Sequence, residues 1–398
     1  MMNRIEKWLA QAAGVKTTKP GDDLSCQVAY VGAHDVTSPI AIDQFEAIGV
    51  DRVFDPDRVF MVVDHIYPAS TEKARQGVWK MKDFAERYGT HLFEKGEGVI
   101  HQVLHEKFDV QPGDIVVIAD SHTCTCGGYG AIGIGVGSTE QAAAMATGKL
   151  DVEVPEVVNV VLTGKLSPYV SGKDLILFLA AEFGADYLTD RGLIISGPGI
   201  NEFSIAERMT VCNMGTELGS MITLFGDEEP ETDVMRTLEV DLSDLKPQIA
   251  CPFSPVNVKP VSEVAGTPIT QVAVGSCTNG RLNDMEQVYN VLKDHKVASH
   301  VNMLVFPASR EIQNEMDRLG WSEVIRNAGA TLLNPGCGPC FGAHEGLVTP
   351  RDVVVSSTNR NFPGRMGSTE AQIYLASPLT AVLSAVKGEI VEPGAENA

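Results

Sequence analysis

Cys337 and Cys340 lie three residues apart in the segment NPGCGPCFG, between glycines and a proline and directly after a short apolar run. A C-x-x-C pair occurs in redox sites, in zinc sites and among the ligands of iron-sulfur clusters, and the spacing alone does not separate these uses. A third cysteine, Cys277, lies in VGSCTNGR, where the pattern predicts a strand-to-helix turn. Three thiolates on two turns suit a cubane iron-sulfur cluster with one iron that lacks a protein ligand and can act as a Lewis acid, and after that a zinc site. Cysteines that serve packing or redox chemistry are the remaining alternative.

Several histidines lie beside carboxylates or at comparable loop positions. They occur in VVDHI (Asp64 and His65), GVIHQVL (His101) and ADSHT (Asp120, Ser121 and His122). A carboxylate beside an imidazole fixes its tautomer and raises its pKa, which makes a proton donor near neutral pH. Each histidine taken singly fits a hydrogen-bonded structural role better. Their recurrence at strand ends and loops favours an acid-base site.

The segment SSTNRNFPGRMGS contains Arg360 and Arg365 next to Asn359 and Asn361. The planar fork of arginine matches a carboxylate bidentately, so two arginines this close can clamp a di- or tricarboxylate. The alternative is a surface turn with solvated arginines. The pattern alone supports both interpretations equally.

Two further segments have simpler explanations. The stretch GGYGAIG contains a formal G-x-G-x-x-G, but a dinucleotide-binding fingerprint follows its strand directly, and this one does not. Close backbone packing before a helix starting at Ser138 explains it better. Glu217, in TVCNMGTELG, is either a solvated carboxylate or a partner of a site histidine, and the pattern favours the solvated carboxylate.

The elements that must position these residues follow one rhythm. Apolar, β-branched runs precede small polar loops and then helical patterns, as in a largely parallel α/β protein. The runs that carry chemistry are RVFMVVDHI, GDIVVIADSHT, TQVAVGSCTNG, GATLLNPGCG and RDVVVSSTNRNF. Ligands of open α/β sheets bind beyond the carboxyl ends of the strands, so we expect the five loops to form one site.

The chain has 398 residues, of which 44% are hydrophobic and 38 are glycine, which indicates a globular α/β protein with several domains. We place the domains near 1–155, 156–265 and 266–398, with an acidic, proline-bearing connector across 226–268. The N-terminal segment MMNRIEKWLAQAAG has neither a signal-peptide nor a membrane-anchor pattern. We therefore expect a cytoplasmic protein, in which grouped cysteines bind metal more often than they form disulfides.

The formal net charge is −21. Nucleic acids and anionic membranes are bound by clustered Lys and Arg, so this charge argues against both as partners. A small anionic substrate would need a local basic patch, and the arginine segment is the candidate for it.

Four ordered motifs, DSHTCT, GSCTNGR, GCGPC and STNRNFPGRMGS, resemble those of the aconitase superfamily, in particular large subunits of the 3-isopropylmalate dehydratase and homoaconitase type. The likeness runs from HDVTSP to YLASP, nearly the whole chain. It implies three-layer α/β/α domains with largely parallel sheets. It also implies a hydro-lyase that removes water from a 2-hydroxy di- or tricarboxylate, and can add it back, through a cis-alkene intermediate.

The resemblance further implies a 4Fe-4S cluster held by Cys277, Cys337 and Cys340, whose fourth iron binds the substrate hydroxyl and carboxylate. Asp64 and His65 then match the pair that protonates the departing hydroxyl. The remaining matches are a supporting acid-base network of His101, Asp120, His122 and Glu217, and substrate contacts from His34, Ser121, Asn359, Arg360 and Arg365.

One-chain aconitases carry a mobile C-terminal (swivel) domain with a serine base and further arginines, and this sequence ends near VKGEIVEPGAENA without a match to it. We therefore expect a separate small subunit that carries the domain. 3-Isopropylmalate, an intermediate of leucine biosynthesis, is the first candidate substrate. Homocitrate, 2-methylmalate and 2,3-dimethylmalate are the alternatives.

Two other classes of function compete with this interpretation. A cluster-switched RNA-binding regulator would fit the superfamily, but the net charge and the lack of a basic tract argue against it. A zinc-site scaffold would be separated from a cluster enzyme by its lack of colour and of iron and acid-labile sulfide.

Overall fold

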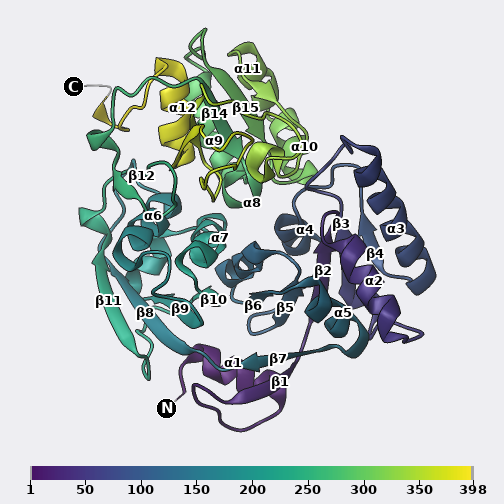
Figure 1. Ribbon diagram of the computed structural model, residues 1–398. Helices are drawn as coiled ribbons and strands as arrows, with labels where there is room; N and C mark the ends of the chain where they lie inside the picture. Colours follow the sequence, from purple (N-terminus) through teal and green to yellow (C-terminus); the bar gives the residue numbers. More distant parts are fainter. Residues whose placement is uncertain (1, 396–398) are drawn as a thin grey trace.

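The computed structural model describes residues 2–395 and contains three large β-sheets flanked by helices, together with one small sheet (Figure 1). Most neighbouring strands of the large sheets run parallel. The predicted α/β class with layered, largely parallel sheets is therefore confirmed. All five strands predicted before the chemistry-bearing loops are present.

The first large sheet has five parallel strands and helices on both faces. Val59 and Met61 pack in one apolar cluster with α2, α3 and α5, whereas Phe60 and Val62 pack with α4 on the other face. In spatial order the strands are β4 (His91–Phe93), β3 (Val59–Val62), β2 (Tyr30–His34), β5 (Ile115–Ile118) and β6 (Ile132–Gly135), and the helices are α2 (Ser38–Ile48), α3 (Glu72–Tyr88), α4 (Ile100–Lys107) and α5 (Ser138–Thr147).

The N-terminal segment closes the bottom of the molecule in Figure 1. Helix α1 (Arg4–Ala13) begins at Asn3, whose side chain and Glu6 form a reciprocal capping box. Strand β1 (Asp23–Gln27) then pairs antiparallel with β7 (Lys149–Glu153), which leads out of the first sheet. This small sheet joins the beginning of the chain to the start of the second large sheet.

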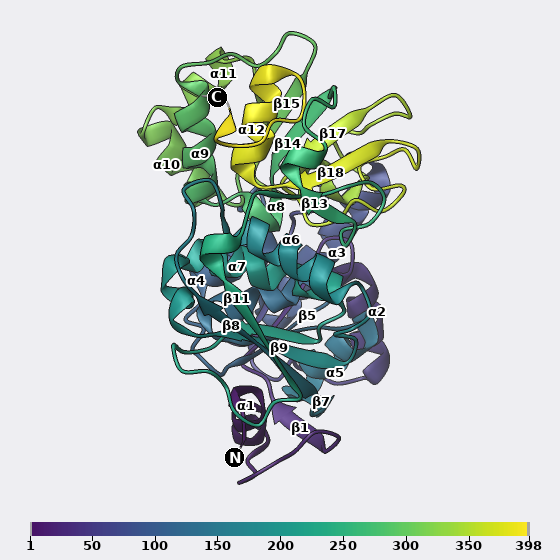
Figure 2. The same ribbon diagram turned by 90° about the vertical axis from the view of Figure 1, so that its left-hand side faces the viewer.

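The second large sheet has four parallel strands. Helix α6 packs its apolar residues against this sheet and, in the same cluster, against residues of the third sheet. Figure 2 shows α6 between the two sheets. The elements, with strands in spatial order, are β10 (Ile222–Phe225), β9 (Arg191–Ser196), β8 (Glu156–Thr163), β11 (Arg236–Asp241), α6 (Gly172–Phe183) and α7 (Ile205–Asn213).

The third large sheet has seven strands, and helices again cover it. Its strands in spatial order are β13 (Val258–Pro260), β12 (Gln248–Ala250), β18 (Gln372–Ala376), β17 (Val353–Ser356), β14 (Gln271–Gly275), β15 (Asn302–Phe306) and β16 (Thr331–Leu332). Its helices are α8 (Ser276–Asn279), α9 (Leu282–Leu292), α10 (Arg310–Arg318), α11 (Trp321–Asn327) and α12 (Pro378–Lys387).

Short 3-10 segments complete the described secondary structure. They are η1 (Pro56–Arg58), η2 (Ser121–Tyr129), η3 (Pro198–Glu202), η4 (Met214–Leu218), η5 (Leu242–Asp244), η6 (Val261–Glu263) and η7 (Gly338–Phe341). Among residues 2–395, no helix is long and apolar enough to cross a membrane.

The three-domain division stays a prediction, and the sheets follow it with one difference. Strands β12 and β13 lie within the predicted second domain, 156–265, yet they add to the third sheet as an antiparallel edge. The sequence around them is proline-rich and polar, and three-residue strands are too short for a period-2 pattern to reveal them.

Candidate active site

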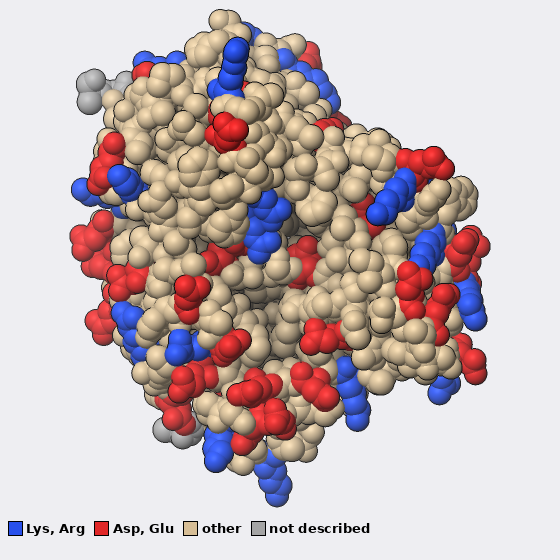
Figure 3. All heavy atoms as spheres, viewed as in Figure 1, with Lys and Arg blue, Asp and Glu red and all other residues tan. Residues whose placement is uncertain are grey.

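The loops after the carboxyl ends of strands from the first and third sheets converge on one cavity of about 270 Å³. Figure 3 shows a hollow in the middle of the face that Figure 1 presents, with one basic group at its upper edge and acidic side chains below. Of the sequence-predicted site residues, these line the cavity: His34, Asp64, His65, His101, Asp120, Ser121, His122, Cys277, Cys337, Cys340, Asn359, Arg360 and Arg365. The expectation that the five loops meet is confirmed.

Asp64 and His65 follow β3 and form the shortest acid-base contact of the site. The Asp64 carboxylate lies 2.6 Å from Nδ1 of His65, and both residues are buried. Burial alone would lower the pKa of His65, but the charge and hydrogen bond of Asp64 outweigh it and raise the pKa to about 9. His65 therefore carries a proton at neutral pH.

Asp35 fixes the backbone of residues 64–66, although the sequence analysis did not name it as a site residue. Its carboxylate oxygens accept hydrogen bonds from the backbone N-H groups of Asp64 at 3.1 Å, His65 at 2.9 Å and Ile66 at 2.9 Å. Because these bonds occupy the carboxylate, the close group of His34, Asp35, Asp64 and His65 is better explained as an acid-base cluster than as a metal site. The only sequence signal is the acidic residue in HDVTSP, after a predicted strand.

His34, at the end of β2, has the opposite protonation behaviour to its neighbour. Its ring stacks on that of His65 with centroids 3.9 Å apart. Burial, together with the positive charge of His65, lowers the pKa of His34 to about 4. The stacked pair thus consists of one neutral and one protonated imidazole at pH 7.

A second chain of contacts runs from α4 to the arginine loop. Nε2 of His101 lies 3.0 Å from Asp120, which also accepts the backbone N-H of His122 at 2.7 Å. Nε2 of His122 lies 2.9 Å from Glu217, and Glu217 pairs with Nε of Arg360 at 2.7 Å. Burial opposes ionisation of Asp120, but its histidine partners hold its pKa well below the usual value.

Glu217 does not line the cavity but supports two residues that do. It lies on η4 and is only 5% exposed, so the pattern-based expectation of a solvated carboxylate is wrong. Burial opposes its ionisation, but the hydrogen bond from His122 and the charge of Arg360 lower its pKa. Glu217 therefore holds His122 and Arg360 in fixed positions as a buried anion.

The three grouped cysteines are buried on the same cavity. The backbone N-H of Cys337 donates to the carbonyl of Asp64 at 3.1 Å, which ties the cysteine loop to the acid-base turn. Burial is the first cause that raises the pKa of each thiol, to about 12 for Cys277. The three thiols can therefore become thiolates only together with a positively charged partner, such as a metal centre.

Two asparagine side chains donate to the cysteine site. Nδ2 of Asn213 lies 3.3 Å and Nδ2 of Asn359 lies 3.4 Å from Sγ of Cys277, and Asn359 also contacts Cys340. Asn213, which is fully buried, was missed by the sequence analysis. It lies in the same quoted segment as Glu217, but a buried amide gives no pattern that separates it from a surface asparagine.

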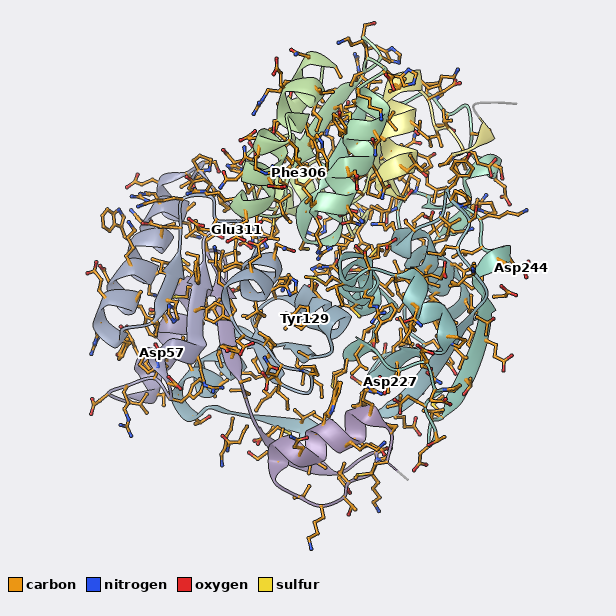
Figure 4. All side chains as sticks on the ribbon, turned by 180° about the vertical axis from the view of Figure 1, so that it is seen from behind. Asp57, Tyr129, Asp227, Asp244, Phe306 and Glu311 are labelled. Atoms are coloured by element: carbon orange, nitrogen blue, oxygen red, sulfur yellow. The ribbon has the colours of Figure 1, made fainter. Side chains whose placement is uncertain are left out.

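Two glycines allow the cysteine turns to approach the core. A Cβ at Gly275 (φ +153°) would overlap the backbone carbonyl of Phe306, and a Cβ at Gly338 (φ +56°) would lie 2.8 Å from the Phe306 ring. Phe306 ends β15 and is labelled in Figure 4. Only glycine fits both turns, because each needs a positive φ and close packing.

The glycine-rich stretch after Asp120 serves packing. A Cβ at Gly128 would lie 2.6 Å from the Cα of Met209 on α7, and Gly127 and Gly133 meet backbone as closely. Tyr129, within this stretch, ends η2 near the middle of the molecule (Figure 4). The expected explanation, close backbone packing before a helix that begins at Ser138, is confirmed.

Comparison with known proteins agrees with this site. Residues 6–236 and 226–388 match the aconitase family (aconitate hydratase). The probable 3-isopropylmalate dehydratase large subunit of Methanothermobacter thermautotrophicus is 43% identical over 99% of both chains, and the 3-isopropylmalate dehydratase large subunit 1 of Methanopyrus kandleri is 42% identical over 98% of both. The probable methanogen homoaconitase large subunit of M. thermautotrophicus is 40% identical over 99% of this chain and 98% of its own.

A crystal structure of Thermococcus kodakaraensis aconitase X in its holo form has a TM-score of 0.51 and 13% identity, covering 84% of each chain, and so is similar in fold alone. The fold and the sequence matches define an enzyme of the hydro-lyase class. The chain belongs to the aconitase family.

Proposed function

We propose that this chain is the large subunit of a dehydratase for 3-isopropylmalate, with a 4Fe-4S cluster held by Cys277, Cys337 and Cys340. The observation that carries the proposal is that the three buried thiols share one cavity with a protonated His65 and with Arg360. Relatives named 3-isopropylmalate dehydratase large subunit support the substrate. Homocitrate is the second candidate because a relative named homoaconitase large subunit is nearly as similar; 2-methylmalate and 2,3-dimethylmalate are further candidates.

The residues present fit such a cluster. Three soft thiolate ligands leave one iron of a cubane open, and amide donors at the sulfurs, as from Asn213 and Asn359, stabilise their charge. The chemistry that the cluster supplies when bound is Lewis acidity toward the substrate hydroxyl. No electron transfer is needed for the removal of water.

His65 is the proton donor to the departing hydroxyl in this proposal. Its Nδ1 is bonded to Asp64, so the proton that it delivers comes from Nε2. The negative charge of Asp64 keeps the imidazole protonated until transfer. His101, Asp120 and His122 form the network beside it, and His34, held neutral, lines the pocket.

The substrate carboxylates are bound by Arg360 and Arg365, with Asn359 and Ser121 as further contacts. Glu217 forms an ion pair with Nε of Arg360. This contact leaves the other guanidinium nitrogens free to face the cavity, which Arg360 lines. A fixed guanidinium loses less entropy on binding a carboxylate than a free one.

A small subunit that carries the swivel domain completes the active site. The rim offers apolar surface for it: Phe341, Leu347 and Phe362 are 36%, 49% and 41% exposed. They lie on segments 338–348 and 362–367, which pack together, since a Cβ at Gly342 would lie 3.2 Å from the backbone N of Met366. Covering this rim would exclude water from the cavity.

The proposal is tested first by composition. Anaerobically purified protein should be brown and contain about four irons and four sulfides per chain. The double variant Cys337→Ser, Cys340→Ser should lose both, whereas Cys251→Ser, which changes an equally buried cysteine outside the cavity, should keep them. Full cluster content in the double variant would refute the ligand assignment.

The substrate is tested with the chain reconstituted with its small subunit and supplied anaerobically with a panel of substituted malates and homocitrate. The highest kcat/KM should be found with 3-isopropylmalate. A clear preference for homocitrate would leave the dehydratase class intact and replace the substrate.

A further inference from the structure

Lys173 is a fully buried lysine that does not line the active-site cavity. It lies in the first turn of α6, and its relative exposure is 0%. Its Nζ donates hydrogen bonds to the backbone carbonyls of Ser357 at 2.8 Å and Thr358 at 2.6 Å. These two residues follow β17 and directly precede Asn359 and Arg360, so one side chain from the second sheet's layer supports the arginine loop of the third sheet.

Among the described residues, no carboxylate accepts a hydrogen bond from Lys173. Its neighbour Asp174 instead accepts from Ser171, through N at 2.9 Å and Oγ at 2.8 Å, and from the backbone N-H of Gln248 at 2.8 Å. Burial lowers the pKa of Lys173 to about 7, and the charges of Cys340, Asp284, Asp174 and Cys277, in decreasing order, oppose this fall. A buried ammonium that is not hydrogen-bonded to an anion is costly, so this site favours further negative charge nearby.

Asn359, which follows Thr358, contacts Sγ of Cys277 at 3.4 Å and Sγ of Cys340 at 3.5 Å, so the backbone that Lys173 holds adjoins the cysteine site. We infer that Lys173 is a positioning residue that fixes the Ser357–Thr358 backbone beneath Asn359 and Arg360 and, through this contact, places a buried positive charge beside the thiolates of the cysteine site. This inference rests on the proposed function for its second half, because the thiolates are the cluster ligands. The first half depends only on the two hydrogen bonds to backbone carbonyls.

The two halves predict separate effects of Lys173→Met, which keeps the apolar stem and removes the charge. Replacing a buried charge by an apolar group of similar shape usually permits folding. Without the ammonium, segment 357–361 should exchange its amide hydrogens faster. The reduction midpoint potential of the cluster should become more negative, because a positive charge near it favours the reduced form.

Misplacement of Arg360 in Lys173→Met should raise KM more than it lowers kcat, with a loss of kcat/KM of up to about 100-fold.

The first measurement is hydrogen-deuterium exchange of peptides that cover 357–361, with cluster-free full-length chain. Lys173→Met should exchange about tenfold faster there, a change of the size expected for the loss of such charged hydrogen bonds. Lys165→Gln, which changes an exposed lysine after β8, should match the wild type. Lys173→Arg keeps the charge and donors, and should restore most of the protection. Because no cluster is present, this result does not depend on the proposed function.

The second measurement is a redox titration of anaerobically loaded protein, followed by electron paramagnetic resonance. Lys173→Met should shift the midpoint to more negative values, and Lys173→Arg should not. If wild-type chain holds no iron, the proposed function fails while the exchange result still decides the positioning role. Unchanged exchange in Lys173→Met, or exchange in Lys173→Arg as fast as in Lys173→Met, would overturn the inference. If Lys173→Met does not fold, Lys173→Arg alone decides the inference. This variant must then exchange the amide hydrogens of 357–361 at the wild-type rate and keep the wild-type midpoint potential. Any other result contradicts the inference.

Discussion

An imidazole in water has a pKa near 6.5, so it donates a proton efficiently only around that pH. In this site the carboxylate of Asp64 keeps His65 protonated up to about pH 9. The pair contributes stability that is fully present below pH 6.5 and is lost as the pH rises through about 9, because only the folded state holds the proton in that window.

Asp64→Asn should therefore change the pH profile of the reconstituted enzyme. With the carboxylate gone, burial lowers the pKa of His65, so the basic limb of kcat/KM should move from near pH 9 to below about pH 7.5, at least one unit. Steady-state rates from pH 5 to 10 measure this, with Asp43→Asn on the exposed side of α2 as the control. An unmoved basic limb would show that another group donates the proton.

Arg360→Lys tests the carboxylate clamp. Lysine keeps the charge but loses the fork that bonds Glu217 through Nε and presents its other nitrogens to the cavity. We expect a fall in kcat/KM of about 10- to 100-fold, as for the loss of one charged hydrogen bond. Arg351→Lys changes an exposed arginine in the turn before β17 and should match the wild type. Equal kinetics of the two variants would remove Arg360 from the site.

At this scale, most residues that sequence reasoning found share a property: a reactive or polar side chain in a loop after a predicted strand; His101, at the start of α4, and Glu217, on η4, are the exceptions. Asp64, His122 and Cys277 all satisfy this description. Asn213 and Lys173 do not, because they lie in a helix end and a helix start, where polar residues are ordinarily exposed. Only the packing of α6 and α7 between two sheets buries them, and no local pattern contains that information.

At the scale of elements, the strands and their order along the chain were predictable because each buried parallel strand is a continuous apolar run. The meeting of loops from two different sheets was not contained in any one run. It results from α4, α7 and α8 packing at the centre of the molecule (Figure 1). The antiparallel strands β12 and β13 were not predicted. Strands this short are recognisable only by their hydrogen-bonded partner strands, and the local sequence does not contain that information.

Gly275→Ala tests the turn that presents Cys277. A Cβ there would overlap the backbone of Phe306, which cannot rotate away, and alanine is strained at this φ. We expect a loss of about 2–5 kcal/mol in the free energy of unfolding and reduced iron content. Thermal unfolding and iron analysis measure the two effects. Gly137→Ala, where the nearest atom is a flexible carboxylate oxygen at 3.5 Å, should show neither. Wild-type stability in Gly275→Ala would show that the turn relaxes freely.

At the scale of the whole molecule, charge and apolar surface are distributed unequally. Acidic and basic side chains are both spread over the face in Figure 3, and one basic group lies at the upper edge of the hollow. The general negative charge repels polyanions, and the local basic edge can still admit a small carboxylate. Phe341 lines the cavity, and with the exposed Leu347 and Phe362 it belongs to the two packed segments 338–348 and 362–367 that we propose the small subunit covers.

The last prediction is that the cluster-loaded chain needs this partner for turnover. In the proposed mechanism His65 donates the proton and Arg360 and Arg365 bind the carboxylates, but among the described residues that line the cavity we assign none to the serine base that the resemblance places on the swivel domain. Turnover should be negligible without a small subunit of about 150 residues, one ordinary domain, and should rise to saturation near one partner per chain.

The same titration locates the contact. Leu347→Glu and Phe362→Glu place charge in the apolar rim, so each should raise the partner concentration needed for half-maximal activity by about tenfold or more, since burying an unpaired carboxylate is costly. Val15→Glu, which alters an equally exposed residue after α1 at the far end of the molecule, should titrate like the wild type. Full activity of rigorously partner-free chain would contradict the split site and would place the base among the residues of this cavity. Rim variants that titrate normally would leave the partner requirement in place but move the docking surface elsewhere.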